Sequence, residues 1–130
     1  MSRVAPYLLV GIGGFAGANA RLMLARLIAV SVDTRFPLGT FVINTSGSFL
    51  LGLITVLVAE RFLPYPEEVR LAAGIGFLGA FTTFSTFEFE TNVLLDSGAW
   101  AQAALNVIGS AVAGLIAVRV GVAIARGWVA

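Results

Sequence analysis

The sequence predicts an all-α membrane protein with four transmembrane helices in a single domain that spans residues 1–130. Hydrophobic residues make up 58% of the chain and charged residues 12%, whereas a soluble domain is usually near half apolar and a quarter charged. Four apolar segments are each long enough to cross a bilayer, which takes about 20 residues. Composition and segment length therefore agree on a compact helical bundle within a membrane.

The composition also excludes several function classes. The chain has no histidine and no cysteine, which removes most metal sites, thiol chemistry and the usual proton carrier at neutral pH. Its formal net charge of +1 argues against nucleic-acid binding, which needs a concentrated basic face. No segment places a nucleophile beside a base, so we do not expect an enzyme.

Polar stretches separate the apolar segments and set the order of the helices. The first segment begins near the N-terminus, but it is too long for a cleaved signal peptide and it carries two arginines. Stretches containing proline, glycine or charge lie at 31–37, 64–68 and 96–98. The helices are therefore expected over residues 4–30, 38–63, 69–95 and 99–125.

Orientation in the membrane should follow the distribution of arginines between the two sides. The chain has no lysine, so arginine supplies all of its basic side chains. Arg21 is expected deeper than the rest, and the bias between the two sides is weak, which permits insertion in both orientations. One side would hold Arg3, Arg61, Arg70 and Arg126, and the other would hold Arg26 and Arg35.

The first helix contains a glycine-rich motif, GIGGFAGANAR, at residues 11–21. Gly13 and Gly17 are four residues apart, so they share a face and favour close packing of another helix. Arg21 lies where a guanidinium is costly in hydrocarbon. It either faces a partner or a water-filled vestibule, or it reaches the interface from near the helix end.

The second and fourth helices each carry a polar stripe with a spacing of four residues, which keeps its members on one slowly drifting face. Each stripe has two interpretations: hydrogen bonds that hold helices together, or a polar track that contacts an ion. The stripes are Asn44, Ser48 and Gly52, and Gln102, Asn106, Ser110 and Gly114.

The third segment carries the most unusual pattern, GIGFLGAFTTFSTFEFE at residues 74–90. Four hydroxyls alternate with phenylalanines, and each hydroxyl needs a partner in hydrocarbon. Glycines and the Thr82–Thr83 pair make a continuous helix costly here, so we expect a break near the middle of this helix. Carbonyls freed by the break would be satisfied by water and hydroxyls, or by a cation.

These side chains suggest an ion path. Amides and hydroxyls replace hydration without holding an ion too tightly to release it. Ring edges of phenylalanine suit an anion and ring faces suit a cation, so the residues alone leave the sign of the ion open. Beyond the aromatics, Glu88 and Glu90 should point to different sides of a helix.

Three pieces of the chain resemble the Fluc (CrcB) family of fluoride channels. They are GGFAGANAR at 13–21, GTFVINTSGSFLLG at 39–52 and GFLGAFTTFSTFEFE at 76–90. The last piece is specific to that family, and the other two come in the right order and spacing. Because chain length and the four apolar segments also agree, the resemblance covers nearly the whole chain.

The resemblance implies an antiparallel, dual-topology homodimer with two narrow fluoride pores between its subunits. It implies that the rings of Phe84 and Phe87 meet fluoride at their edges and that Asn44 hydrogen-bonds within the pore. Gln102 departs from the family pattern, because some relatives have tyrosine there. The remaining implied roles are hydroxyls along a polar track at Ser85 and Ser110, vestibule residues Arg21 and Glu90, and a structural sodium ion on the backbone carbonyls of Gly79 and Thr82.

The expected function is therefore a passive fluoride channel that lets cytoplasmic fluoride out through the inner (plasma) membrane of a prokaryotic cell. Its expected partners are a second copy of itself, fluoride and membrane lipid, and no nucleic acid. The alternative is a small dual-topology exporter of cationic compounds driven by proton exchange. That alternative needs a carboxylate in the first helix, and the first helix has none. A bundle subunit without transport activity is the third interpretation.

Overall fold

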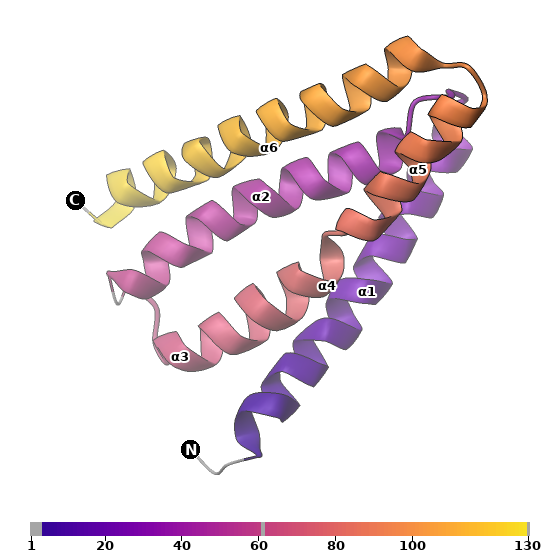
Figure 1. The fold of residues 1–130 in the computed structure, drawn as a ribbon. Helices are drawn as coiled ribbons and strands as arrows, with labels where there is room; N and C mark the ends of the chain where they lie inside the picture. The colour runs from indigo at the N-terminus through magenta and orange to yellow at the C-terminus, as the bar shows by residue number, and fades with distance from the viewer. Residues whose placement is uncertain (1–3, 61, 130) are drawn as a thin grey trace.

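The computed structural model describes residues 4–60 and 62–129, and these residues are helical through most of their length. The long helices are α1 (Ala5–Ser31), α2 (Leu38–Ala59) and α6 (Trp100–Val129) (Figure 1). Between α2 and α6 lie α3 (Pro66–Val69), the π-helix η1 (Arg70–Leu78), α4 (Gly79–Phe81) and α5 (Phe84–Asp96). The described residues form no β-strand, so the all-α prediction is confirmed.

Three of the helices, α1, α2 and α6, are long and apolar enough to cross a membrane, which agrees with a multi-pass membrane protein. The segment expected as the third spanning helix, 69–95, is divided among η1, α4 and α5, each shorter than a membrane span. The chain leaves α4 at Phe81 and enters α5 at Phe84, with Thr82 and Thr83 in extended conformations.

Two predicted helix ends were wrong by four residues. α2 ends at Ala59 and not at residue 63, and Pro64 and Pro66 lie shortly beyond this end, where proline cannot continue a helix. α6 continues to Val129 and not only to residue 125. Arg126 lies in its last turn, where a cation interacts favourably with the helix dipole, so it does not end the helix.

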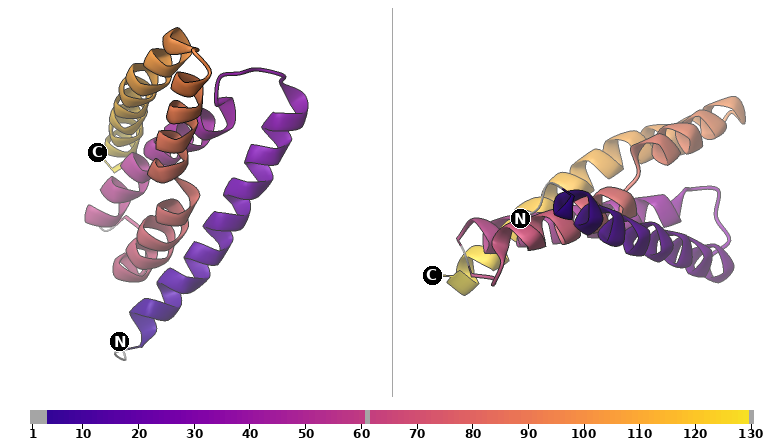
Figure 2. Two further views of the ribbon diagram at one scale, coloured as in Figure 1. Left: turned by 45° about the vertical axis from the view of Figure 1, so that its right-hand side comes forward. Right: turned by 90° about the horizontal axis from the view of Figure 1, so that it is seen from below.

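α1 packs backbone to backbone against η1, as Figure 2 shows from two directions. A Cβ added at Gly13 would overlap the carbonyl oxygen of Ala72, and one added at Gly17 would overlap that of Phe77. The close packing predicted for these two glycines is therefore confirmed, and the partner is the π-helix. Neither position has room for a side chain.

α2 and α6 lie side by side over most of their length (Figure 1). Glycines again permit the approach, because a Cβ at Gly52 would overlap the backbone of Val118 and one at Gly121 would overlap that of Phe49. The buried apolar side chains form two clusters, Ile43 with Leu78 and Phe81, and Val56 with Leu57 and Ala125. α2 is thus the central helix, since both clusters include it.

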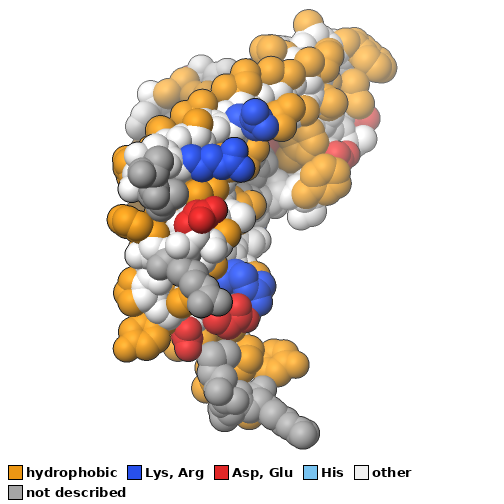
Figure 3. Space-filling model, turned by 90° about the vertical axis from the view of Figure 1, so that its left-hand side faces the viewer, with side chains coloured by type: hydrophobic (Ala, Val, Ile, Leu, Met, Phe, Trp, Pro, Cys, Tyr) orange, Lys and Arg blue, Asp and Glu red, His pale blue; other side chains and the backbone are white. Residues whose placement is uncertain are grey.

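Hydrophobic side chains cover much of the surface, and on the face that Figure 3 shows charged side chains are scattered among them. Arg70 donates to both carboxylate oxygens of Glu67 at 2.9 and 2.7 Å, which lowers the pKa of that carboxyl. Arg3 and Arg61, which the orientation prediction used, lie outside the described residues. That prediction also left out Arg119, which lies within α6.

Candidate functional site

The interruption between α4 and α5 has no continuous backbone hydrogen bonding, and side chains take its place. Thr82 is extended at φ −78° and ψ 157°, and Thr83 at φ −150° and ψ 119°. The N–H and the hydroxyl of Thr82 both donate to the carbonyl of Leu78, at 3.0 and 2.9 Å. These two hydrogen bonds to one carbonyl oxygen cap the C-terminal end of α4.

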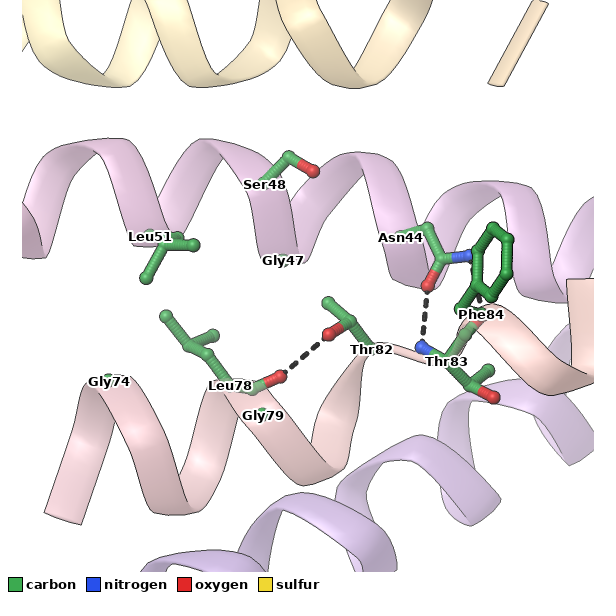
Figure 4. A pocket seen from close by; sticks show the side chains of 10 residues that line it. All are labelled: Asn44, Gly47, Ser48, Leu51, Gly74, Leu78, Gly79, Thr82, Thr83 and Phe84. Carbon is green, nitrogen blue, oxygen red and sulfur yellow. Dashed lines mark hydrogen bonds between the residues drawn. The ribbon is translucent and has the colours of Figure 1, made fainter. Parts of the chain in front are cut away.

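Asn44 of α2 forms hydrogen bonds to Thr83, the second residue of the interruption. Its Oδ1 accepts from the N–H of Thr83 at 2.8 Å, and its Nδ2 donates to the Thr83 carbonyl at 3.0 Å (Figure 4). The interhelical bond that was one interpretation of Asn44 is therefore present. An asparagine amide carries two N–H donors, so this pairing uses one of them.

The hydroxyl of Thr83 caps α5. Thr83 Oγ1 accepts from the N–H of Thr86 at 3.3 Å and donates to the Thr86 hydroxyl at 3.0 Å. Threonine is a favoured N-cap because its oxygen satisfies one of the free N–H groups of the first turn. The sequence alone predicts Thr83 as part of the helix break, but it does not predict this cap or the pairing with Asn44.

The same hydrogen bonds take donors away from two backbone carbonyls. In a continuous helix the N–H of Thr83 would bond to the carbonyl of Gly79, and that of Thr86 to the carbonyl of Thr82. Here the first goes to Asn44 and the second to Thr83 Oγ1. Gly79 and Thr82 are thus left without their helical donors, which makes their carbonyl oxygens available to another partner.

A cavity of about 310 Å³ lies beside the interruption, between α2 and the η1–α4 segment (Figure 4). Of the predicted site residues it brings together four, from two parts of the chain. In this view Ser48 points toward α6 and away from Thr83. The polar stripe expected on α2 therefore faces two different elements, α6 at Ser48 and the interruption at Asn44. The predicted residues in this cavity are Asn44, Gly79, Thr82 and Phe84.

The two expected pore rings lie close together at the start of α5. The ring centroids of Phe84 and Phe87 are 5.8 Å apart, with the planes inclined by 37°. Phe84 is 75% exposed and borders the cavity, whereas Phe87 is half-buried and does not line it. Ser85 is exposed between them.

Arg21 and Glu90 line a second cavity of about 440 Å³, together with Thr40, Thr83 and Thr86. The two predicted vestibule residues are therefore in one place. Glu88 is exposed and Glu90 is half-buried, so the two carboxylates do point to different sides. Oε2 of Glu90 is buried and has no hydrogen-bond partner among the described residues.

The cavities form a series along α2. The first and the second share Thr83. The second shares Thr40 and Glu90 with a third cavity of about 300 Å³, which reaches Thr34 and Phe36 in the α1–α2 connection. Neutral hydroxyls therefore recur from the helix interruption to the end of the bundle.

A buried polar network joins α5 to α6. Asn106 is fully buried; its Nδ2 donates to Thr91 Oγ1 at 2.9 Å, and Thr91 Oγ1 donates to the carbonyl of Phe87 at 2.8 Å. Ser110 donates to Asn106 Oδ1 at 3.3 Å, so Ser110 lies in this network and outside the three cavities described above. Thr91 was missed because nothing in its sequence neighbourhood separates it from an ordinary helix position.

Comparison with known proteins places the chain beside one family. The family described as "CrcB-like protein, Camphor Resistance (CrcB)" matches residues 8–122. Several proteins named fluoride-specific ion channel FluC are similar over most of their length. That of Solibacter usitatus is 45% identical over 92% of this chain and 98% of the relative. That of Prosthecochloris aestuarii is 44% identical over 97% of both chains, and that of Methanocaldococcus jannaschii 44% identical over 88% and 89%.

Proposed function

Because the chain belongs to the CrcB family, we propose that it is a passive, fluoride-selective channel that releases fluoride from the cytoplasm. The observation that carries this proposal is the full-length similarity to proteins named fluoride-specific ion channels. Hydrogen fluoride is a weak acid that crosses membranes as a neutral molecule and ionises inside, so trapped fluoride needs a channel to leave. Conduction involves no covalent chemistry, in line with the expectation that the chain is not an enzyme.

The series of cavities supports this function. Hydroxyls of Thr40, Thr83 and Thr86 recur along it, and Arg21 adds a positive charge to the second cavity. Neutral donors can replace the hydration shell of an anion without binding it so tightly that it stops. An arginine beside the path raises the local concentration of anions.

The proposed assembly is an antiparallel homodimer in which each subunit crosses the membrane four times as a single domain. The interrupted segment from η1 to α5 supplies the fourth crossing in this proposal. The cavity beside the interruption lies between α2 and the η1–α4 segment, whereas α6 packs on the other side of α2 (Figure 4). A second copy seated there would enclose Phe84, which is otherwise an exposed aromatic ring beside polar groups.

The pore contacts are proposed for side chains that carry a hydrogen-bond donor, a ring edge or a charge. Asn44 retains one N–H after pairing with Thr83. The edges of Phe84 and Phe87 carry partial positive charge and suit an anion. The hydroxyls of Ser85 and Ser110 extend the polar track, and Arg21 and Glu90 form the vestibule.

A structural sodium ion is proposed on the carbonyls of Gly79 and Thr82. Its support is that both carbonyls lose their helical donors to Asn44 and Thr83. Neutral carbonyl oxygens suit a hard monovalent cation, and two antiparallel copies would supply four of them. The bound ion would hold the two interruptions together and raise the positive potential near both pores.

The direct test is ion efflux from liposomes that contain the purified protein. We expect a fluoride electrode to record rapid fluoride release and a chloride electrode to record little release from matched vesicles. Fluoride retention equal to that of protein-free liposomes, or equal release of both anions, would contradict the proposal.

A further inference from the structure

α6 carries two charged side chains, Arg119 and Arg126, and no carboxylate between Trp100 and Val129. Seven residues on a helix with 3.6 residues per turn return to nearly the same direction, so both arginines lie on one face. Both side chains are exposed. The salt bridge recorded among the described residues joins Arg70 to Glu67 and involves neither of them.

The face that carries these arginines points away from the rest of the bundle. The opposite face of α6 is the one buried against α2 and α5, and it includes Asn106, Gly121 and Ala125. Around the arginines the surface is apolar, which is typical of a surface that faces lipid tails. The exposed apolar neighbours on this side include Ile108, Val112, Leu115 and Ile116.

Arg119 is too far from the helix end to lie at the membrane surface. α6 has 30 residues, a length of about 45 Å, against a hydrocarbon thickness of about 30 Å. Arg119 lies ten residues before Val129, about 15 Å along the axis. In a centred helix its backbone is therefore roughly 8 Å inside the hydrocarbon boundary, where a guanidinium needs an anionic partner.

We propose that Arg119 extends along α6 toward its C-terminal end and binds the phosphate of an anionic phospholipid, with Arg126 as a second contact nearer the surface. A long arginine stem can lie along apolar surface while its charged end reaches the headgroups. Two positive charges on a face without carboxylates complement the negative charge of such a lipid. A second copy of the chain is the less suitable occupant, because the proposed dimer contact is at the cavity between α2 and the η1–α4 segment, and α6 does not line that cavity (Figure 4).

The lipid site can be tested by tryptophan quenching, because the chain has only two tryptophans and both can be replaced. Trp100→Phe and Trp128→Phe together give a protein without tryptophan fluorescence. Ala123→Trp then places a reporter one turn beyond Arg119 on its face, and Ala101→Trp places a matched reporter on that face five turns earlier. Both alanines are exposed. Each protein is reconstituted in phosphatidylcholine vesicles that contain brominated phosphatidylglycerol or brominated phosphatidylcholine in both leaflets, so that orientation does not matter.

We expect phosphatidylglycerol to be enriched at the Ala123→Trp reporter, on the order of fivefold for one basic side chain near the lipid headgroups. The Ala101→Trp reporter should show no enrichment. Adding Arg119→Gln should remove most of the preference, and adding Arg119→Lys should retain most of it because the charge remains.

Equal quenching by the two lipids at Ala123→Trp would overturn the proposal even before Arg119 is changed. So would a preference that survives Arg119→Gln. Shielding of that reporter from both brominated lipids would instead assign this face to a second copy of the chain. Quenching at Ala101→Trp in each variant reports whether the protein remains inserted.

Discussion

The side-chain amide of Asn44 pairs with both backbone groups of Thr83, at 2.8 Å to its N–H and 3.0 Å to its carbonyl. This reciprocal pair attaches α2 to the interruption between α4 and α5. It also removes the N–H that the Gly79 carbonyl would receive in a continuous helix. One side chain therefore fixes where the helix is interrupted and leaves a backbone carbonyl available there.

Asn44→Asp should reduce fluoride efflux more than Asn44→Ser. Aspartate keeps an acceptor for the Thr83 N–H but sets a negative charge against the Thr83 carbonyl and against an anion. Serine retains a hydroxyl donor, although it is too short to bond to both backbone groups. Losing a partner for a buried backbone group costs about 1–3 kcal/mol, so both variants should also unfold at lower temperature. Asn19→Ser, at an exposed asparagine bonded within its own helix, is the matched control. The reverse order of efflux would rule out donation from Asn44 to an anion.

Phe84→Ile and Phe87→Ile should each reduce fluoride efflux steeply and leave the dimer intact. Isoleucine keeps apolar volume but has no ring edge with partial positive charge. Phe89→Ile serves as the control, because Phe89 is 69% exposed on the same helix and has no proposed pore contact. Efflux within about twofold of the unmodified protein, a barrier change of roughly 0.4 kcal/mol, would remove these rings from the pore.

Replacing sodium with a large organic cation on both sides of the membrane should weaken the dimer or stop fluoride efflux. The Gly79 and Thr82 carbonyls would then lack a partner in the membrane interior. Asn44→Ala should raise the sodium concentration needed for half-maximal dimer stability, because the Thr83 N–H becomes free to return to Gly79. Dimer stability measured by cross-linking or mass photometry checks both points. Unchanged stability and efflux without sodium would mean that water satisfies the interruption.

Thr91→Val should destabilise the protein by about 1–3 kcal/mol, because it leaves the fully buried Nδ2 of Asn106 without its acceptor. Thr91→Ser keeps the hydroxyl and should cost less. Thr55→Val is the control, since the exposed Thr55 hydroxyl bonds only within its own helix. Thermal unfolding in detergent ranks the three variants. Equal midpoints for Thr91→Val and Thr55→Val would show that the network between α5 and α6 contributes nothing.

Both orientations should occur in one membrane, because the bias of arginines between the two sides is weak. Single cysteines at Ser97 and Pro64 lie in connections at opposite ends of the bundle, and the native chain has no cysteine. Each should react with an impermeant thiol reagent from both sides of the membrane. Labelling of one position from one side only would contradict dual topology.

Local chemistry in the sequence is enough to predict much of this architecture. Apolar length predicts the membrane segments, proline and glycine predict their connections, and the spacing of Gly13 and Gly17 predicts a close helix contact. Each of these depends on neighbours along the chain. Among the described residues, the structure agrees for three of the four predicted membrane segments and for the glycine contact. The alternation of hydroxyls and aromatics at 74–90 likewise indicates a site, because hydrocarbon does not satisfy hydroxyls.

Only the tertiary structure decided which polar groups form hydrogen bonds with each other. Asn44 and Thr83 are 39 residues apart in sequence, and Asn106 and Thr91 face each other from different helices. Asn44 had two interpretations in the sequence, because an amide donor suits a backbone carbonyl and an anion equally well. The packing of α2 against the interruption brings both the carbonyl and the N–H of Thr83 to that amide. The sequence by itself determined that polar groups lie within the membrane, and the fold determined their partners, because a hydrogen bond depends on distance and direction in space.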